Sequence, residues 1–271
     1  PMGINHGLRI ETNYPVISKS SLIVNLYANY WESRYTSPTV FSTAPAPEQA
    51  LAQSLAEHPL RSIAVGALAF KPLNERHFLL FQLEPSLNGN YNFDDLEPDF
   101  SNLRYSASAL FGWKLSDRTN LAVGATRTYR GGRLLHIPIL LYNHTFNERW
   151  GTELLLPARG HLRYNFSVKS LLLIGYELEG QTYALQTSGD APFAGELFPP
   201  DNELELRKSE IRGRVQFRRS LTDFVWLDLQ AGVRAAYRFD LDANPDATEA
   251  LLENNIGVPL YFRVGLALVS P

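Results

Sequence analysis

The chain has 271 residues and a formal net charge of −3, a balance that gives no reason to expect nucleic acid as a partner. It contains no cysteine, which excludes disulfides and thiolate-bound metals. No apolar run reaches the roughly 20 residues of a membrane-spanning helix, and the mean hydropathy is −0.18; a transmembrane β-barrel stays compatible with both, because only alternate residues of its strands face lipid.

The N-terminal residues 1–19 are polar, and we expect them to form an irregular periplasmic arm ahead of a barrel spanning 20–271. The opening Pro1-Met2-Gly3 lacks the basic and apolar regions of a signal peptide, so we interpret the sequence as a mature, exported chain. Residues 22–35 then alternate with a period of two, which predicts the first strand.

The next segment, 36–59, is rich in Pro, Ala and Ser. Within it, residues 47–57 have helical spacing, and Pro47 stands where a first helical residue is expected. We predict a short helix on a solvated loop. The alternative is a lid or docking element over one mouth of the barrel.

Hairpins follow one another through the rest of the chain, each with a short connection between two alternating segments. A single strand closes the chain, which makes twelve strands with the first. The predicted segments are 61–70 with 78–88, 102–115 with 120–130, 133–145 with 150–157, 160–167 with 170–185, the two halves of 207–240 about residues 220–223, and 255–269.

The segment 207–240 indicates the environment of the strands. From Leu227 to Phe239 every second side chain is apolar, whereas the residues between them, beginning with Asp228, are mostly polar or charged. An apolar face toward lipid and a charged face toward an enclosed lumen account for such long strands. We therefore predict an all-β fold, a 12-stranded antiparallel up-and-down transmembrane β-barrel. A soluble β-protein is the weaker alternative.

Connection lengths predict the orientation of this barrel. Short turns alternate with longer connections, notably 36–60, 90–101, 186–202 and 241–254. Outer-membrane barrels have short periplasmic turns and longer extracellular loops. An even strand number would leave both termini on the short-turn, periplasmic side.

Aromatic residues gather near the predicted strand ends, as in the girdle at a membrane interface. Trp226 has lumen-side parity, so its membership requires a bulge at the neighbouring turn. The candidate interface aromatics are Trp31, Trp113, Phe146, Trp150, Phe217, Phe224 and Trp226.

Three stretches carry a family resemblance: GRLLHIPILLYNHTFNERW at 132–150, LLLPARGHLRY at 154–164 and GYELEGQTY at 175–183. The sequence resembles a domain-of-unknown-function family of outer-membrane barrels common in Bacteroidetes. The resemblance implies a barrel in the outer membrane of a Gram-negative bacterium and implies no chemistry.

Charged residues of the inward face are the candidate site. Folding each hairpin about its connection puts Glu177 opposite Arg212 and Arg214 opposite Asp228. A paired lumen predicts a structural or accessory subunit of an envelope assembly, with outer-membrane lipid, lipopolysaccharide and other outer-membrane proteins as partners. A porin-like, narrow diffusion pore or anion-preferring solute transporter is the alternative. The predicted lumen network comprises Glu177, Glu179, Arg212, Arg214, Arg218, Asp228, Arg234 and Arg238.

No pattern indicates an enzyme, a metal site or a cofactor. His136 and His144 are roughly 26 Å apart on one strand, at about 3.3 Å per residue, too far to share a metal. No Ser, His and Asp pattern indicates a hydrolase. The acidic stretches 94–99 and 240–246 are interpreted as solvated loops, because Pro245 stands where an EF-hand requires Gly.

Overall fold

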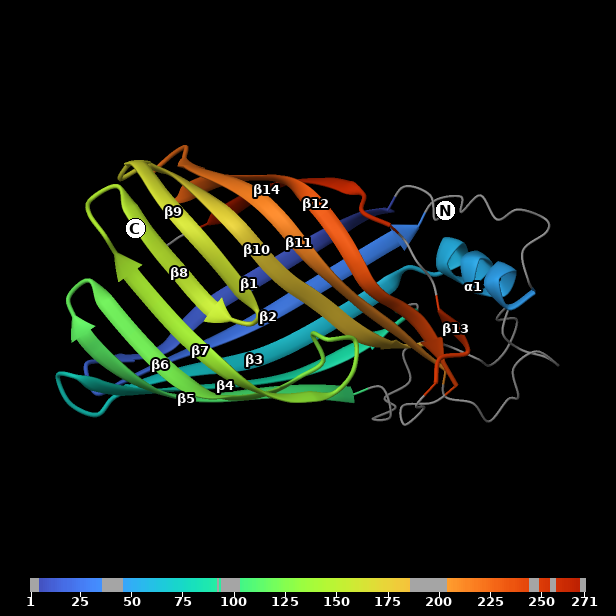
Figure 1. Cartoon of the computed structure of the whole chain (residues 1–271), viewed down its shortest axis with the longest axis horizontal. Helices are drawn as coiled ribbons and strands as arrows, with labels where there is room; N and C mark the ends of the chain where they lie inside the picture. The colour runs from blue at the N-terminus through green and yellow to red at the C-terminus, as the bar shows by residue number, and fades with distance from the viewer. Residues whose placement is uncertain are drawn as a thin grey trace.

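The computed structural model describes residues 5–35, 46–91, 93, 103–185, 204–243, 249–253 and 257–268, and these residues are almost entirely β-strand (Figure 1). The predicted all-β class is confirmed, but the sheet of the described residues has 14 strands, not the predicted twelve, because β1 and the short β13 were not expected. No helix in the described ranges is long and apolar enough to cross a membrane. The elements are β1 (Asn5–Lys19), β2 (Leu22–Tyr35), α1 (Ala46–Glu57), β3 (Leu60–Pro72), β4 (His77–Gly89), β5 (Leu103–Ser116), β6 (Thr119–Thr128), β7 (Leu135–Thr145), β8 (Trp150–Leu156), β9 (Arg159–Ser167), β10 (Ser170–Ala184), β11 (Glu205–Ser220), β12 (Val225–Asp242), β13 (Leu252–Glu253) and β14 (Leu260–Leu268).

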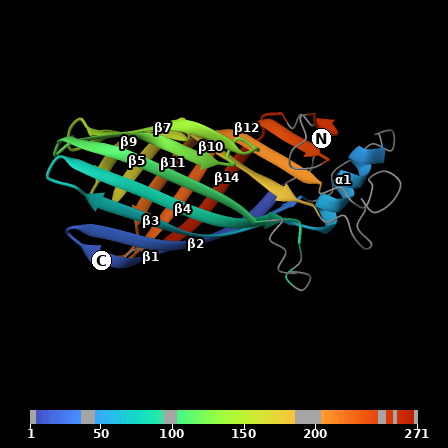
Figure 2. The same cartoon turned by 90° about the horizontal axis from the view of Figure 1, so that it is seen from below.

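The strands form one sheet that curls into a barrel (Figures 1 and 2). Consecutive strands from β1 to β13 are antiparallel neighbours, and β14 pairs with β12. A single parallel bridge, Ala184 with Gly89, joins β10 back to β4. Seven strands, β4 to β10, therefore form a closed barrel, and the other strands extend it on both sides.

The N-terminal strand β1 corrects the expectation of an irregular arm. It pairs with β2 from Asn5↔Tyr35 to Lys19↔Leu22. The additional strand places Asn5 at the end of the barrel where α1 lies, so the two ends of the described chain do not share the short-turn side (Figure 1). Leu8, Ile10, Tyr14 and Val16 of β1 do alternate with polar residues, but the polar composition of residues 1–19 as a whole led us to expect an irregular arm.

The predicted difference between the two ends of the barrel is present in the described residues. The turns between β3 and β4, β5 and β6, β7 and β8, β9 and β10, and β11 and β12 are all short. The longer connections leave from the end that carries α1 (Figure 2). The acidic stretch 94–99 and residues 244–246 of the second one lie outside the described residues.

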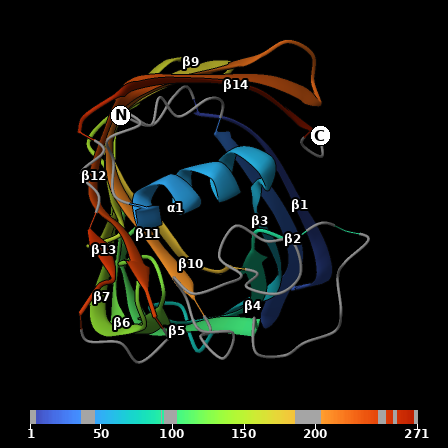
Figure 3. The same ribbon diagram turned by 90° about the vertical axis from the view of Figure 1, so that its right-hand side faces the viewer.

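Helix α1 packs into the mouth of the barrel rather than lying on a solvated loop (Figure 3). Leu51 and Leu55 are each only 2% exposed. Their neighbours are strand residues, so the helix buries its apolar face against the sheet. The cluster comprises Tyr35, Leu51, Leu55, Leu60, Tyr183, Leu185, Leu204, Leu206, Phe239 and Leu241.

A β-bulge explains why Phe239 belongs to this cluster although its parity predicts the outer face. The register between β11 and β12 shifts between Ser209, opposite Arg238, and Glu210, opposite Ala236. One extra residue in β12 reverses the faces of everything beyond it. Phe239 and Leu241 consequently point inward and are fully buried.

A second apolar cluster fills the inside of the barrel toward the short turns. Phe78, Leu110, Ala122 and Ile139 form its buried centre. The partly buried side chains around it are Phe70, Leu80, Leu141 and Leu155. The charged residues of β10 to β12 therefore lie in a lumen that has apolar clusters toward both of its ends.

Candidate functional site: the charged lumen

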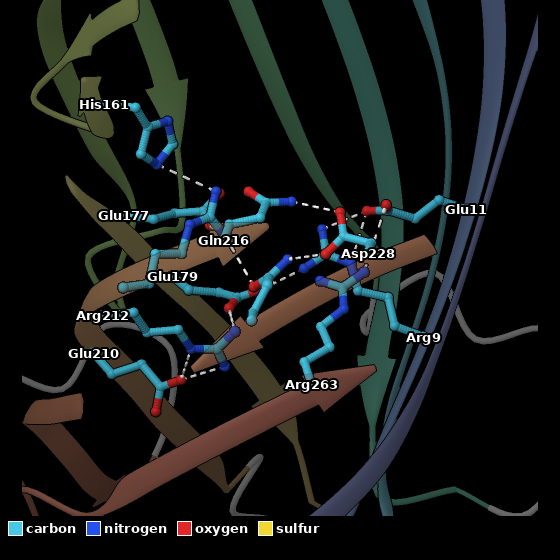
Figure 4. Close-up of polar contacts among 12 residues, drawn as sticks. Arg9, Glu11, His161, Glu177, Glu179, Glu210, Arg212, Gln216, Asp228 and Arg263 are labelled. Atoms are coloured by element: carbon cyan, nitrogen blue, oxygen red, sulfur yellow. Dashed lines mark hydrogen bonds and ion pairs between the residues drawn. The ribbon is translucent and has the colours of Figure 1, made fainter. Parts of the chain in front are cut away.

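A chain of alternating charges crosses the lumen through Arg212 (Figure 4). The Arg212 guanidinium pairs with Glu179 of β10, and its Nε donates to Glu210 at 2.6 Å. Glu179 also accepts a hydrogen bond from Arg9 of β1 at 2.8 Å. The side chains of Arg212, Glu179 and Glu210 are 12%, 11% and 5% exposed, so these charges are largely withdrawn from water.

The same chain continues across the gap between the first and last strands. Arg9 pairs with Glu11 at 2.5 Å, and Glu11 lies 4.0 Å from Arg263 of β14. Strands β1 and β14 run in the same direction and have no hydrogen-bonded pairing with each other in the described residues. Side-chain charges, rather than a backbone ladder, link the two edges of the sheet.

A second group of polar side chains surrounds Arg214 and Asp228. Arg214 pairs with Glu177, and its guanidinium lies 3.2 Å from His161 Nε2 and 3.4 Å from Gln230 Oε1. Gln230 donates to Asp228 at 3.1 Å. Asp228 also accepts from the Gln216 amide and lies 3.5 Å from Arg218. Arg212, Arg214 and Arg218 of β11 are thus each matched by a carboxylate.

The expected register is confirmed between β10 and β11 and wrong between β11 and β12. Glu177 lies directly opposite Arg212, as predicted, but its ion pair is with the diagonal neighbour Arg214. Asp228 lies opposite Arg218, not Arg214. The difference arises because β11 continues to Ser220, which pairs with Trp226, so the hairpin bends later than we predicted.

Two further residues of the predicted lumen network, Arg234 and Arg238, lie away from its centre. Arg234 lies 3.9 Å from Glu210, at the margin of the network. Arg238 lies beyond the bulge and pairs with Asp240 at 3.7 Å, apart from the network. The sequence analysis missed Arg9, Glu11, His161, Glu210 and Arg263; alternation of Arg9 and Glu11 was the available signal for the first two.

Trp31, a predicted interface aromatic, points into the lumen instead. Cationic groups of Arg9, Lys208 and Arg212 lie 5.6, 5.4 and 5.6 Å from its ring centre. Cations over an indole face are attracted by its quadrupole. Parity explains the correction, because Trp31 shares the inward face of β2 with Tyr27.

An aromatic band does follow the outer face near the short turns. Phe111 and Trp113 contact edge to face, as do His144 and Phe146. Another series of ring contacts runs Trp150, Tyr164, Phe166, Phe217. Phe224 is 56% exposed in its turn. Trp226 keeps the inward parity of Asp228, because the register shows no bulge at this turn.

A cavity of about 380 Å³ adjoins the charged network. Arg9, Glu177 and Glu179 line one part of it. No three His, Asp or Glu residues in the described part of the chain lie close enough together to hold a metal ion. His136 and His144 have the same parity on β7, whereas His161 of β9 contacts Arg214 in the lumen.

A family model described as "Domain of unknown function (DUF6268)" matches residues 44–242, which is more than half of the chain. The chain belongs to the DUF6268 family. No curated protein matches it. The predicted resemblance to a family of unknown function is confirmed, whereas the outer-membrane location and the link to Bacteroidetes stay predictions.

The DUF6268 match covers α1 and β3 to β12, and so contains the whole closed barrel from β4 to β10. It includes Glu179, Glu210 and Arg212. Arg9 and Arg263 lie in the flanking strands. The ion-pair network therefore connects the DUF6268 region to the strands on both sides of it.

Proposed function

We propose that this DUF6268 protein is a transmembrane barrel of a bacterial outer membrane, with its short turns in the periplasm and α1 on the outer side. The outer face of β14 carries this proposal. Its Leu260, Phe262, Val264, Leu266 and Leu268 are 69–81% exposed. A contiguous apolar face of this kind is a liability in water, and in lipid it is the normal outer surface of a strand.

The outer aromatic band supports the same placement. Aromatic residues of transmembrane barrels form girdles at the level of the lipid headgroups. The band defined by Trp113, Phe146, Trp150, Phe166 and Phe217 lies beside the short turns, where such a girdle is expected. Outer-membrane lipid and lipopolysaccharide would then surround the strands.

Within the membrane, we favour a structural or accessory role in an envelope assembly over transport. The interior holds two apolar clusters, and between them the arginines of the network are paired with carboxylates. A conducting pore instead needs a continuous hydrated path. The connections at the α1 end would offer other outer-membrane proteins a docking surface.

Membrane placement predicts a difference between two exposed valines. Val215 of β11 is 44% exposed on the outer face, and Val168, in the turn after β9, is 94% exposed. Arginine at a lipid-facing position costs about 2–4 kcal/mol at the bilayer midplane and less toward the headgroups. Val215→Arg should therefore lower the yield of folded, heat-modifiable barrel in membranes, whereas Val168→Arg should not.

The measurement compares boiled with unboiled samples by gel electrophoresis after extraction in mild detergent. Equal tolerance of both arginines, together with a wild-type chain that is monodisperse without detergent, would support a soluble β-protein instead.

The occluded interior predicts the electrical behaviour of the isolated barrel. Reconstituted wild-type protein should give no stepwise current in a planar lipid bilayer, because the two apolar clusters and the ion pairs between them would interrupt a hydrated path. A stable, anion-selective current would contradict the structural role and favour the narrow pore.

A further inference from the structure

Beyond the β8–β9 turn no strand pairing fills the barrel wall between β7 and β10, whose ribbons diverge there in Figure 1, and we call this stretch of the wall the window. Strand β8 pairs with β7 only over residues 140–145, which leaves residues 135–139 of β7 without a β8 partner. Strand β9 pairs with β10 only as far as Glu177. The two short strands turn back at Pro157 and Ala158, part-way along the barrel.

The segment between β6 and β7 frames the opposite side of this window. Its Arg130 carbonyl accepts a hydrogen bond from Ser209 Oγ at 2.8 Å. A Cβ at Gly180 of β10 would overlap that carbonyl, so glycine permits the close approach. Pro138 pairs with Ala125 of β6 but lies in the stretch of β7 that has no β8 partner, where a missing N–H is tolerated.

The cavity of about 380 Å³ lies behind the window, because the residues of the window frame line it. Leu135, Ile137, Pro157 and Leu178 make this side of the lining apolar. Hydroxyls of Ser106, Ser108, Thr126 and Thr128 line it from β5 and β6. A volume in the usual range of ligand sites, about 300–1,000 Å³, thus combines an apolar wall with a hydroxyl-rich one.

We propose that this cavity binds a single-chain amphiphile with an uncharged, hydroxyl-bearing head, which enters through the window from the bilayer. The aliphatic chain would contact Ile137 and its apolar neighbours, and the head would exchange hydrogen bonds with the serine and threonine hydroxyls. The lining carries charges of both signs, from Arg9, Arg130, Glu84, Glu177 and Glu179, and Glu177 and Glu179 are already paired with Arg214 and Arg9. A charged head would compete with one of these residues for its ion-pair partner, and so would leave a buried charge without its partner. The inference rests on the proposed membrane location.

The test uses a monoacylglycerol with a photoreactive diazirine in its chain, added to liposomes of phosphatidylethanolamine and phosphatidylglycerol that contain the wild-type protein. Cross-linked residues are mapped by mass spectrometry. We expect labelling at residues 135–139 and 155–158. Ile137→Trp should fill the apolar wall and reduce this labelling about tenfold. Val215→Trp, on the outer face, is the matched control and should leave it unchanged.

Competition on the wild-type protein identifies the head without relying on any variant. Excess unlabelled monoacylglycerol should abolish labelling at the window, whereas a fatty acid or an alkylamine of equal chain length should compete at least about tenfold less well. Equal competition by the fatty acid would overturn the uncharged head. Labelling spread over outward residues of other strands alone would overturn the site.

These failures are separable from failure of the membrane proposal. A protein that inserts into liposomes, resists carbonate extraction and shows no window labelling refutes the ligand site only. A protein that stays in the aqueous fraction refutes the membrane location, and the ligand proposal with it.

Discussion

Arg212→Ala is expected to lower the free energy of unfolding by about 3–5 kcal/mol, the usual cost of breaking a buried ion pair from one side. The guanidinium contacts two carboxylates on two strands, Glu179 and Glu210, which are 11% and 5% exposed. Removing the guanidinium takes a neutralising positive charge from both carboxylates in a site that water enters poorly. Equilibrium unfolding in detergent, followed by tryptophan fluorescence, measures the loss.

Arg219→Ala is the matched control, since Arg219 lies on the same strand and is exposed. It should change the unfolding free energy by no more than about 0.5 kcal/mol. A double-mutant cycle should give a larger coupling of Arg212 with Glu179, its ion-pair partner, than with Glu177, which lies opposite it but pairs with Arg214. A cost under about 1 kcal/mol for Arg212→Ala would indicate a hydrated lumen.

Most of the strands could be predicted because each of them carries its own period-two pattern. The boundaries of β5, β11 and β12 agree closely with the segments of alternating residues, and α1 begins and ends close to its expected limits. In these elements the pattern of polar and apolar residues agrees with the secondary structure that the segment adopts. The register that places Glu177 opposite Arg212 followed from folding β10 and β11 about the long connection between them.

The inward or outward direction of a side chain was less predictable, because one residue reverses it. The bulge near Arg238 turned Phe239 and Leu241 into core residues, and no local feature of β12 announces it. Strand β1 was missed although Leu8, Ile10, Tyr14 and Val16 alternate with polar residues, and with it Arg9 and Glu11 were lost from the network.

The window and the partners of the network depend on contacts distant in sequence. Arg9 and Glu179 are 170 residues apart, and Arg130 meets Ser209 across 79. Such contacts require the full strand order and the early turn of β8 and β9, which short-range patterns do not encode. The sequence therefore predicts that the charged residues of the lumen form ion pairs, but not which residues form each pair.

Leu55→Ala should destabilise the protein by about 2–5 kcal/mol, the range for a leucine truncated in a packed core. Leu55 is 2% exposed on α1 and belongs to the cluster with Tyr183, Leu206 and Phe239. Its loss leaves a cavity between helix and barrel, which surrounding strands cannot easily collapse to fill. Denaturant unfolding gives the stability, and limited proteolysis reports the release of α1.

Glu57→Ala, in the last turn of the same helix, is the matched control. Glu57 is exposed and accepts a hydrogen bond from Gln53 at 2.8 Å, a contact worth about 0.2–0.5 kcal/mol. Equal effects of the two substitutions would show that α1 is a loose cover. Bilayer recordings of Leu55→Ala then separate the two proposed roles. If α1 loosens and no current appears, the ion pairs and the inner apolar cluster suffice to close the barrel. A current that appears only when α1 loosens would make the helix a gate and transport the function.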